Sequence, residues 1–366
     1  MLQEEYRYWL ANLPNIGVRK IDQLLHIFGS AREIYHAPGR MLYALKKDGA
    51  LKQFSEQDVE TIAAGRNAEK VQMEYAKLQK DSIYFVSREE EEYPGKLIPI
   101  FDAPYALYYK GRLPGSQEKL LAVVGARECS PYGIETAKYL AAAIAKAGIG
   151  VVSGLARGID SCAHTGAVSA GGITYAVLGC GIDICYPREN INLYMELQQE
   201  GGIISEYPPG TAPAAGNFPM RNRIISGLSD GILIIEAKEK SGSLITIDYG
   251  LDQGKEIYAL PGRATDRLSA GCNNLIKMGA KLVTTPKDIL EDFLPNYEQT
   301  MDELKKNNKL LETAGKIVYA SLCLEPKHIE EIAASTGLGI DSLMEQLLLL
   351  ELQGLIKQPM KNYYCT

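Results

Sequence analysis

The sequence predicts an α/β protein built on a doubly wound parallel sheet, with helices covering both faces. Three observations predict this fold. Between Lys119 and Leu294, short runs rich in Val, Ile and Leu alternate with segments of helical periodicity, which is typical of a parallel sheet buried on both faces. The residues before this region carry apolar side chains at helical spacing, and a polar linker and a compact helical segment follow Pro295. A chain of 366 residues has room for two or three domains at roughly 100–200 residues each.

These observations divide the chain into five segments. We expect a helical module resembling a helix-hairpin-helix or SAM-like domain at 1–80, a linker with short extended pieces at 81–118, an extended Rossmann-like domain at 119–294, a second linker at 295–308, and a winged-helix-like domain at 309–366. No internal repeat of useful length interrupts this order.

The N-terminal module contains a motif that suits a phosphate backbone. Residues 10–35 indicate two short helices around the turn Leu13–Lys20. Gly17 permits a sharp turn and exposes amides at the next helix start, where Arg19 and Lys20 add positive charge. The motif resembles a helix-hairpin-helix. A small helical packing module is the alternative, and the sequence leaves both open.

In the sheet domain, the strands follow from apolar runs and the helices from the segments between them. The charged stretch Arg88–Glu92 before it indicates a solvated loop, and the prolines and glycines up to Gly111 indicate short extended pieces. We expect strands at Leu120–Val124, Gly150–Ser153, Tyr175–Leu178, Ile203–Ser205, Ile232–Glu236 and Ile257–Leu260, and helices at about Pro131–Ala147 and Ile159–Ser169.

The C-terminal segment predicts a helix-turn-helix. Ile329–Ala334 and Ile340–Leu352 have helical spacing, and the turn Thr336–Gly339 separates them. Gly354 ends the second helix, and the residues after it predict a small wing.

The charge distribution excludes a protein that wraps duplex DNA through a broad basic surface. The formal net charge is −6 and the pI is about 5.5. Lys+Arg against Asp+Glu number 16 to 17 in residues 1–118, 16 to 18 in 119–292, and 7 to 10 in 293–366. Electrostatic wrapping of a duplex needs clustered positive charge. A nucleic-acid ligand would therefore need a local site.

The composition also predicts the compartment. No apolar run approaches the ~20 residues that span a bilayer, and the acidic start Met1–Glu5 lacks a signal-peptide pattern, so we expect a cytoplasmic protein without a membrane segment. The seven cysteines are odd in number and never spaced as C-x-x-C, and the four histidines are dispersed. We therefore expect neither a disulfide framework nor a metal site.

Two glycine-rich loops follow neighbouring strands and predict an anion site. Ligands of parallel sheets bind beyond the carboxyl ends of the strands. The first loop holds Gly125 and Arg127, and the second holds Gly154, Arg157 and Gly158. Neither loop is G-x-G-x-x-G, and no G-x-x-x-x-G-K-[ST] occurs, which argues against NAD binding and P-loop ATP hydrolysis. We expect no cofactor. A tight structural turn is the alternative for each loop.

A third segment combines an aromatic residue with two arginines. It contains, in order, Asn217, Phe218, Arg221, Asn222 and Arg223. An aromatic face stacks on a base while guanidinium groups hold phosphates, which suits single-stranded nucleic acid. The alternative is that Phe218 belongs to the core and that one arginine pairs with Asp230 or Glu206. A fourth loop offers the hydroxyls of Ser241 and Ser243 at a helix N-terminus.

Taken in order, these motifs resemble the DprA (DNA-processing protein A, Smf) family. The resemblance rests on Val124–Arg127, Ser153–Asp160 with Ala163 and His164, Asn217–Arg223, Ser241–Ser243 and Gly271–Ile276, and it covers essentially the whole chain. It implies an extended Rossmann-like fold and a homodimer built on that domain. It also implies that the protein binds single-stranded DNA, protects incoming DNA and loads the RecA recombinase during natural transformation.

Transferred by position, the resemblance implies roles for single residues. Arg127 and Arg157 would contact phosphates, Asn217 and Phe218 would meet bases, and the two later arginines would lie near the backbone. The expected nucleic-acid-binding residues are Gly125, Arg127, Gly154, Arg157, Gly158, Asn217, Phe218, Arg221, Asn222, Arg223, Ser241 and Ser243. The second loop often carries lysine in this family, so Arg157 is a variation that keeps the charge and adds a fork of donors.

Two other functions stay open. A Rossmann-like nucleotide phosphoribohydrolase carries P-G-G-x-G-T-x-x-E where this chain has Ser241–Tyr249. Tyr249 then takes the acidic position, beside Asp248, which weakens the case for N-glycosidic cleavage. His164 lies four residues after Asp160 on one expected helix face, and we expect it to make structural hydrogen bonds rather than act in catalysis.

The second alternative is a helix-turn-helix transcription regulator. The stretch 341–347 of its second helix has neither lysine nor arginine, although readers of the major groove normally use such residues. We expect no catalytic residue and single-stranded DNA as the ligand.

Overall fold

The computed structural model describes residues 1–294, 314–315, 317–322, 326–352, 356–360 and 362–365. The chain divides into two compact units, Met1–Leu290 and Glu291–Thr366. The linker expected at 295–308 and the first residues of the expected winged-helix-like domain lie outside the described residues. None of the helices in the described parts is long and apolar enough to cross a membrane.

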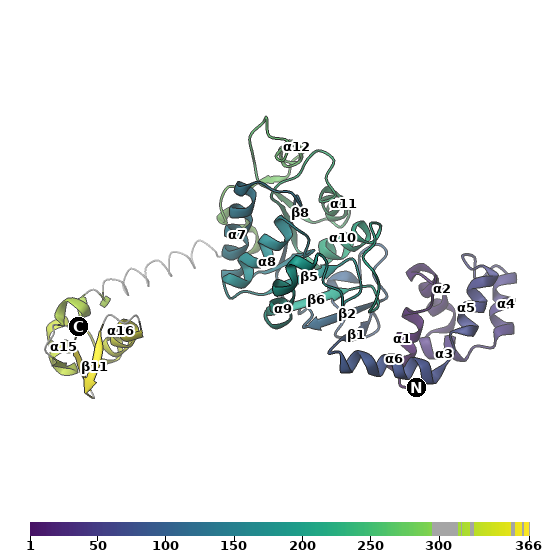
Figure 1. The fold of residues 1–366 in the computed structure, drawn as a ribbon, viewed down its shortest axis with the longest axis horizontal. Helices are drawn as coiled ribbons and strands as arrows, with labels where there is room; N and C mark the ends of the chain where they lie inside the picture. Colours follow the sequence, from purple (N-terminus) through teal and green to yellow (C-terminus); the bar gives the residue numbers. More distant parts are fainter. Residues whose placement is uncertain (295–313, 316, 323–325, 353–355, 361, 366) are drawn as a thin grey trace. The chain divides into compact units, whose positions relative to one another are not determined.

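The N-terminal module is helical, as the sequence predicts (Figure 1). Its helices are α1 (Gln3–Ala11), α2 (Val18–Phe28), α3 (Ala31–His36), α4 (Gly39–Lys47), α5 (Glu56–Ala64) and α6 (Ala68–Lys80). Ile21 and Leu24 of α2 are buried. Ser55 caps α5 by accepting the amide of Asp58, whose carboxylate accepts the Ser55 amide in return, a pairing that satisfies donors at a helix start.

The central domain is a nine-stranded, mostly parallel sheet in the order β1-β2-β6-β5-β4-β3-β7-β8-β9. The strands are β1 (Tyr84–Ser87), β2 (Ala106–Gly111), β3 (Leu120–Val124), β4 (Gly150–Ser153), β5 (Thr174–Leu178), β6 (Gly201–Ser205), β7 (Gly231–Ile234), β8 (Glu256–Ala259) and β9 (Lys281–Leu282). β2 pairs antiparallel with β1 and β6, and all other pairs are parallel.

The short extended pieces expected between 81 and 118 are therefore strands of the sheet itself, and not a connection outside it. Leu107 and Tyr108 of β2 are buried, and β2 bonds along β6 from Tyr108 to Gly111. This pairing covers a strand edge that would otherwise leave its backbone groups unpaired.

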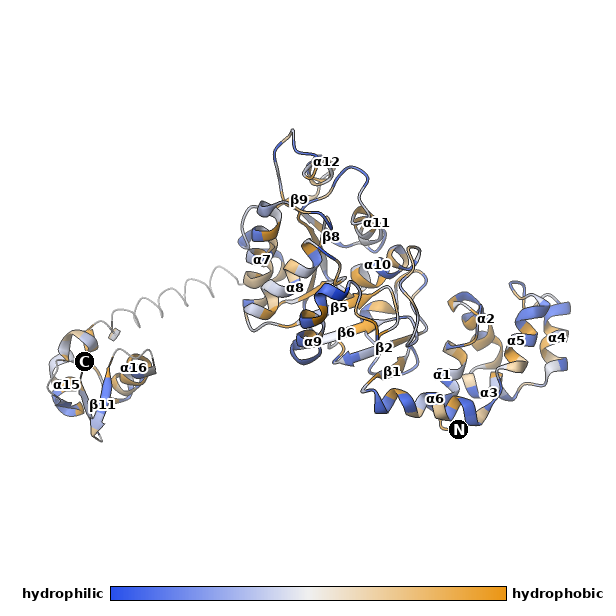
Figure 2. Cartoon of the chain, viewed as in Figure 1, coloured by the Kyte–Doolittle hydropathy of each residue, from blue (hydrophilic) through white to orange (hydrophobic). Residues whose placement is uncertain are grey.

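Helices cover both faces of the sheet. α7 (Pro131–Lys146), α8 (Ile159–Ser169) and α9 (Ile191–Glu200) pack together, and α10 (Asn217–Leu228) packs on α11 (Leu244–Asp252). The chain moves from β3 to β6 in one direction and then returns to β7 on the other side of β3. Since such crossovers are right-handed, the return places α10 and α11 on the opposite face from α7 to α9. Figure 2 shows apolar colour along the central strands. Shorter helices, α12 (Ala270–Lys277) and α13 (Lys287–Phe293), follow β8 and β9.

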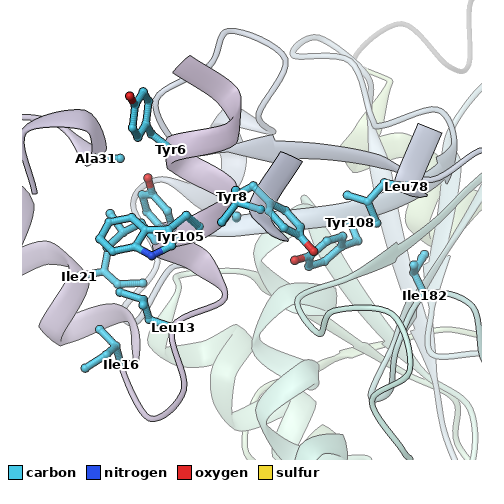
Figure 3. Close-up of a cluster of buried hydrophobic side chains, with 14 of the residues drawn as sticks. Tyr6, Tyr8, Leu13, Ile16, Ile21, Ala31, Leu78, Tyr105, Tyr108 and Ile182 are labelled. Atoms are coloured by element: carbon cyan, nitrogen blue, oxygen red, sulfur yellow. The ribbon is translucent and has the colours of Figure 1, made fainter. Parts of the chain in front are cut away.

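One apolar cluster runs from the helical module into the sheet domain (Figure 3). The rings of Tyr8 and Tyr108 have centroids 6.4 Å apart, and the Tyr108 hydroxyl donates to Asn12 Oδ1 at 2.8 Å. Trp9, 3% exposed, belongs to the same cluster. The module is thus packed against the sheet domain through a shared core.

The C-terminal unit is a helix-turn-helix with a small sheet. It contains β10 (Lys327–His328), α15 (Ile329–Thr336), α16 (Ile340–Leu352), β11 (Lys357–Met360) and β12 (Tyr363–Cys365), and its strands lie in the order β10-β12-β11. Gly337 ends α15 in the left-handed conformation, which glycine adopts without strain. The hairpin of β11 and β12 confirms the predicted wing.

Candidate nucleic-acid interface

A cavity of about 610 Å³ opens at the carboxyl ends of β3 and β7. The loops after these two strands form its walls, together with the first half of α10 and the start of α8. β3 is also the point where the strand order reverses, which is where ligands of doubly wound sheets bind. We call this space at the ends of β3 and β7 the first cavity.

Arg127 and Phe218 form a pair in this cavity. The Arg127 guanidinium lies 5.3 Å from the centre of the Phe218 ring, and Arg127 is exposed while Phe218 is half-buried. Gly125 just before has no room for a side chain, because a Cβ would come within 2.7 Å of Ile159. The Ala126 amide donates to the carbonyl of Glu236 at 2.7 Å, which anchors this loop to the end of β7.

Tyr186 extends the pair into a row of three, and the sequence reasoning missed it. Its ring lies 5.7 Å from that of Phe218 at 32°, it is 45% exposed, and it lines the cavity. Tyr186 lies far from Phe218 in the sequence, so no local motif links the two. One exposed and one half-buried aromatic ring beside a cation suit the face of a base.

Lys238 and Lys240 were also missed. Both are exposed and line the cavity with Ser241 and Ser243. The two serine hydroxyls lie 2.8 Å apart. The signal was present, because both lysines lie in the short stretch between the end of β7 and the serine loop. They add positive charge to the cavity, although Lys238 lies 3.9 Å from the carboxylate of Glu128, which also lines it.

Arg221 lines the same cavity from beneath and is 3% exposed. It donates to the carbonyls of Gly154 and Val177, at the ends of β4 and β5. Burial raises the pKa of Asp160, and the nearby Arg221 opposes that rise. Burial in turn lowers the pKa of Arg221. Arg221 therefore braces the strand ends from a buried position, and its contact with a DNA backbone stays a prediction.

Arg223 points to the other side of α10. It is 3% exposed, and its Nη2 donates to both carboxylate oxygens of Glu206 at 2.7 Å. This confirms the alternative in which one arginine of the pair bonds Glu206. Asn222, between the two arginines, lines the first cavity and donates to the Gly242 carbonyl at 3.4 Å.

The second glycine loop supports the first and contributes little to the cavity wall. Arg157 has a 63% exposed side chain and pairs with Glu189 at 2.7 and 2.9 Å. Gly158 has φ +77, and a Cβ there would lie 2.3 Å from the Ala126 carbonyl. Of this loop and the residues after it, Ala156 and Asp160 line the cavity, while Arg157 does not.

The remaining expected residues also divide into those that line the first cavity and those that lie outside its lining. Gly154 packs against the Arg221 guanidinium, since a Cβ there would lie 2.5 Å from it. Asn217, the first residue of α10, is half-buried beside the cavity wall. The first cavity thus brings together Gly125, Arg127, Phe218, Arg221, Asn222, Ser241 and Ser243, and it leaves out Gly154, Arg157, Gly158, Asn217 and Arg223.

His164 makes a structural hydrogen bond, as expected. It is fully buried, and its Nδ1 lies 2.7 Å from the Thr174 hydroxyl. Burial lowers the pKa of His164 to about 3, so the ring is neutral near pH 7. Among the described residues that line the first cavity, neither Asp248 nor Tyr249 appears.

Comparison with known proteins identifies the family. The family model for DNA recombination-mediator protein A matches residues 84–294, and that for the DprA winged helix domain matches residues 310–359. A protein Smf from Synechocystis is 31% identical, and the match covers 98% of both chains. The chain belongs to the DprA family. The family model begins at β1, inside the stretch expected to be a linker.

Further DprA relatives agree with this assignment. The DNA processing protein DprA of Streptococcus pneumoniae is 44% identical over 55% of this chain and 71% of its own length. An X-ray structure of the pneumococcal DprA superimposes with a TM-score of 0.62 at 34% identity, covering 78% of this chain and 96% of that one. A structure of Helicobacter pylori DprA, described in terms of its single-stranded DNA binding mode, gives 0.52 at 29% identity over 58% and 96%.

Proposed function

We propose that this DprA-family protein binds single-stranded DNA in the first cavity. The observation that carries the proposal is the pair of Arg127 and Phe218, in which a guanidinium lies over an aromatic ring at the carboxyl ends of β3 and β7. Tyr186 adds a second ring, and Lys238 and Lys240 add charge. Stacking with local cations is how proteins hold single strands without reading sequence.

The charge of the chain supports a local site. With a net charge of −6, the protein gains little general electrostatic attraction to a duplex, so a local site must supply the binding. The stacking faces of a single strand are free, whereas those of a duplex are occupied. We therefore infer a preference for single strands, in line with the binding described for the H. pylori relative.

We further propose, from the family, that the protein protects incoming DNA and loads RecA during natural transformation, as a cytoplasmic homodimer built on the Rossmann-like domain. Two cavities side by side would let one strand engage both, which raises avidity without new contacts. Light scattering at tens of micromolar should give twice the mass of one chain. A monomer would contradict the dimer and leave the DNA site standing.

The DNA proposal is tested by fluorescence anisotropy with a labelled single strand and the matching duplex across a salt series. We expect tighter binding of the single strand at every salt concentration. Equal affinity for both forms would reject the site. Loading is tested separately, by asking whether the protein speeds RecA assembly on DNA covered by single-strand-binding protein. We propose no catalytic step, and nucleoside monophosphates should release no free base.

A further inference from the structure

A second cavity, of about 410 Å³, lies on the other side of α10. Consecutive residues of this helix divide the two spaces. Pro219 and Asn222 line the first cavity, while Met220 and Arg223 line the second. The segment Pro99–Asp102 and the end of α11 complete its walls. α10 is thus a shared wall, and a helix is only about 10–12 Å across.

Two buried polar groups in the wall of the second cavity lack partners. Arg223 is 3% exposed, yet its Nε and Nη1 have no hydrogen-bond acceptor among the described residues. Oε1 of Gln253 likewise has no donor there. Buried donors and acceptors left unpaired are unfavourable. The cavity therefore suits a flat group whose edge both accepts and donates hydrogen bonds, and nucleobases have such edges.

Phe101 adds an exposed aromatic face to this cavity. It is 77% exposed, and the Arg19 guanidinium lies 5.1 Å from its ring centre. Asp102 holds Arg19 in place through a 3.0 Å contact. The arrangement repeats the pair of Arg127 and Phe218 in the first cavity. Arg19 also belongs to the turn Leu13–Lys20, whose glycine and basic residues indicate a phosphate grip.

The charges of the wall favour a base over a phosphate as the buried group. Lys96, Lys255 and Arg223 lie in the lining together with Asp102 and Asp252, and Arg223 is paired with Glu206. Lys96 also pairs with Asp230 at 2.7 Å. With the cations largely balanced by carboxylates, attraction for an anion is weak, and stacking would supply most of the affinity.

We propose that the second cavity is a base-binding subsite for the same DNA strand, which passes from the first cavity over Met220. The inference rests on the proposed function, since the strand must first occupy the first cavity. A base stacks on Phe101 with its edge toward Arg223 and Gln253, while Arg19 of the N-terminal module, held by Asp102, supports the same ring. The N-terminal module thereby takes part in DNA binding.

The test compares short and long single strands, of about 4 and about 16 nucleotides, on the full-length protein and its Phe101→Ala variant. Phe101 is so exposed that its truncation leaves the fold intact, and Met73→Ala, 69% exposed on α6, is the matched control. We expect equal binding of the short strand by all three proteins. The long strand should bind Phe101→Ala about 5- to 150-fold more weakly, the range that corresponds to loss of one stacked base.

Two further arms identify the ligand group and its source. A long strand that lacks bases in the half that reaches the second cavity should bind wild type as weakly as the intact strand binds Phe101→Ala. This loss of affinity should depend little on salt, because it is a loss of stacking. Free deoxynucleoside monophosphates, followed by calorimetry, should bind only at millimolar concentration. Tight binding of a free nucleotide that Phe101→Ala abolishes would assign the cavity to free nucleotides and overturn the strand path.

The outcomes separate the two proposals. If Phe101→Ala keeps the full affinity for the long strand while Arg127→Ala weakens both strands, the base subsite is wrong and the first cavity stands. If wild type binds neither strand, the proposed function fails, and the subsite fails with it.

Discussion

Replacing Arg127 by alanine should remove one phosphate contact. Arg157→Ala is the matched control for this change. Arg127 lines the first cavity over the Phe218 ring, whereas Arg157 lies outside the lining and pairs with Glu189 at 2.7 Å. A cation that already has a carboxylate partner releases fewer counterions when DNA binds. We therefore expect the two arginines to differ, although the sequence assigns them equal roles.

The magnitude follows from counterion release. For single strands the logarithm of affinity falls with the logarithm of salt by about 0.7 per neutralised phosphate. Arg127→Ala should reduce the slope by roughly that amount. Between 50 and 200 mM salt, a fourfold change, the gap between wild type and variant should narrow by about 2.6-fold. Arg157→Ala should reduce the slope by less than half as much.

The assay is anisotropy of a labelled single strand at four or more salt concentrations, with circular dichroism to verify folding. Phe218→Ala belongs in the same series, because loss of stacking should weaken binding by about 1–3 kcal/mol at every salt concentration without changing the slope. A folded Arg127→Ala variant with the slope of wild type would refute the phosphate contact. A larger effect for Arg157→Ala would move the contact to the second loop.

Three other predictions concern stability and the C-terminal unit. Arg221→Met should lower the free energy of unfolding by about 3–5 kcal/mol in urea, since it leaves Asp160 and two strand-end carbonyls without their buried partner; Arg157→Met should change it by no more than about 0.5 kcal/mol, and equal effects would reject the bracing role. Burial lowers the pKa of His164 from 6.5 to about 3, so the unfolded chain binds more protons than the folded chain between these pH values. The contribution of the neutral His164 ring to stability is therefore complete above pH 6.5 and falls by about 1.4 kcal/mol per pH unit below it. Urea titrations between pH 6.5 and 5 should show a flatter dependence for His164→Asn, and an unchanged dependence would contradict the burial of a neutral ring. The isolated C-terminal unit, from about residue 305, should bind duplex DNA negligibly, because residues 293–366 carry 7 basic against 10 acidic side chains; sub-micromolar affinity at physiological salt would revive the regulator alternative.

The central strands were predictable because their signal is local. β3 and β4 have the expected bounds, and β5 to β8 begin or end within two residues of them. A strand buried on both faces reads as an unbroken apolar run. β1 and β2 were expected only as extended pieces of a linker, because prolines, glycines and an acidic run surround them. The pairing of β2 with β6 makes them part of the sheet.

The site was predictable where loops follow strands and less so along α10. Gly125, Arg127 and Ser241 lie where the chain leaves a strand, and the topology of the sheet gathers such loops at one edge. Arg221 and Arg223 are two residues apart on a helix of 3.6 residues per turn, so their side chains point about 200° apart. Both could not face one cavity, and helical geometry alone would have separated them.

The packing of the helical module against the sheet has a spectroscopic consequence. Trp9 is the single tryptophan of the chain, and its ring lies 4.9 Å from that of Tyr35 inside the shared apolar cluster. None of the residues that line the first cavity belongs to that cluster. Intrinsic tryptophan emission therefore reports the integrity of the module and of its contact with the sheet domain. The binding of a DNA strand at Arg127 should leave this emission unchanged. One protein, without a label, can thus be followed for unfolding during the same titrations that measure DNA binding.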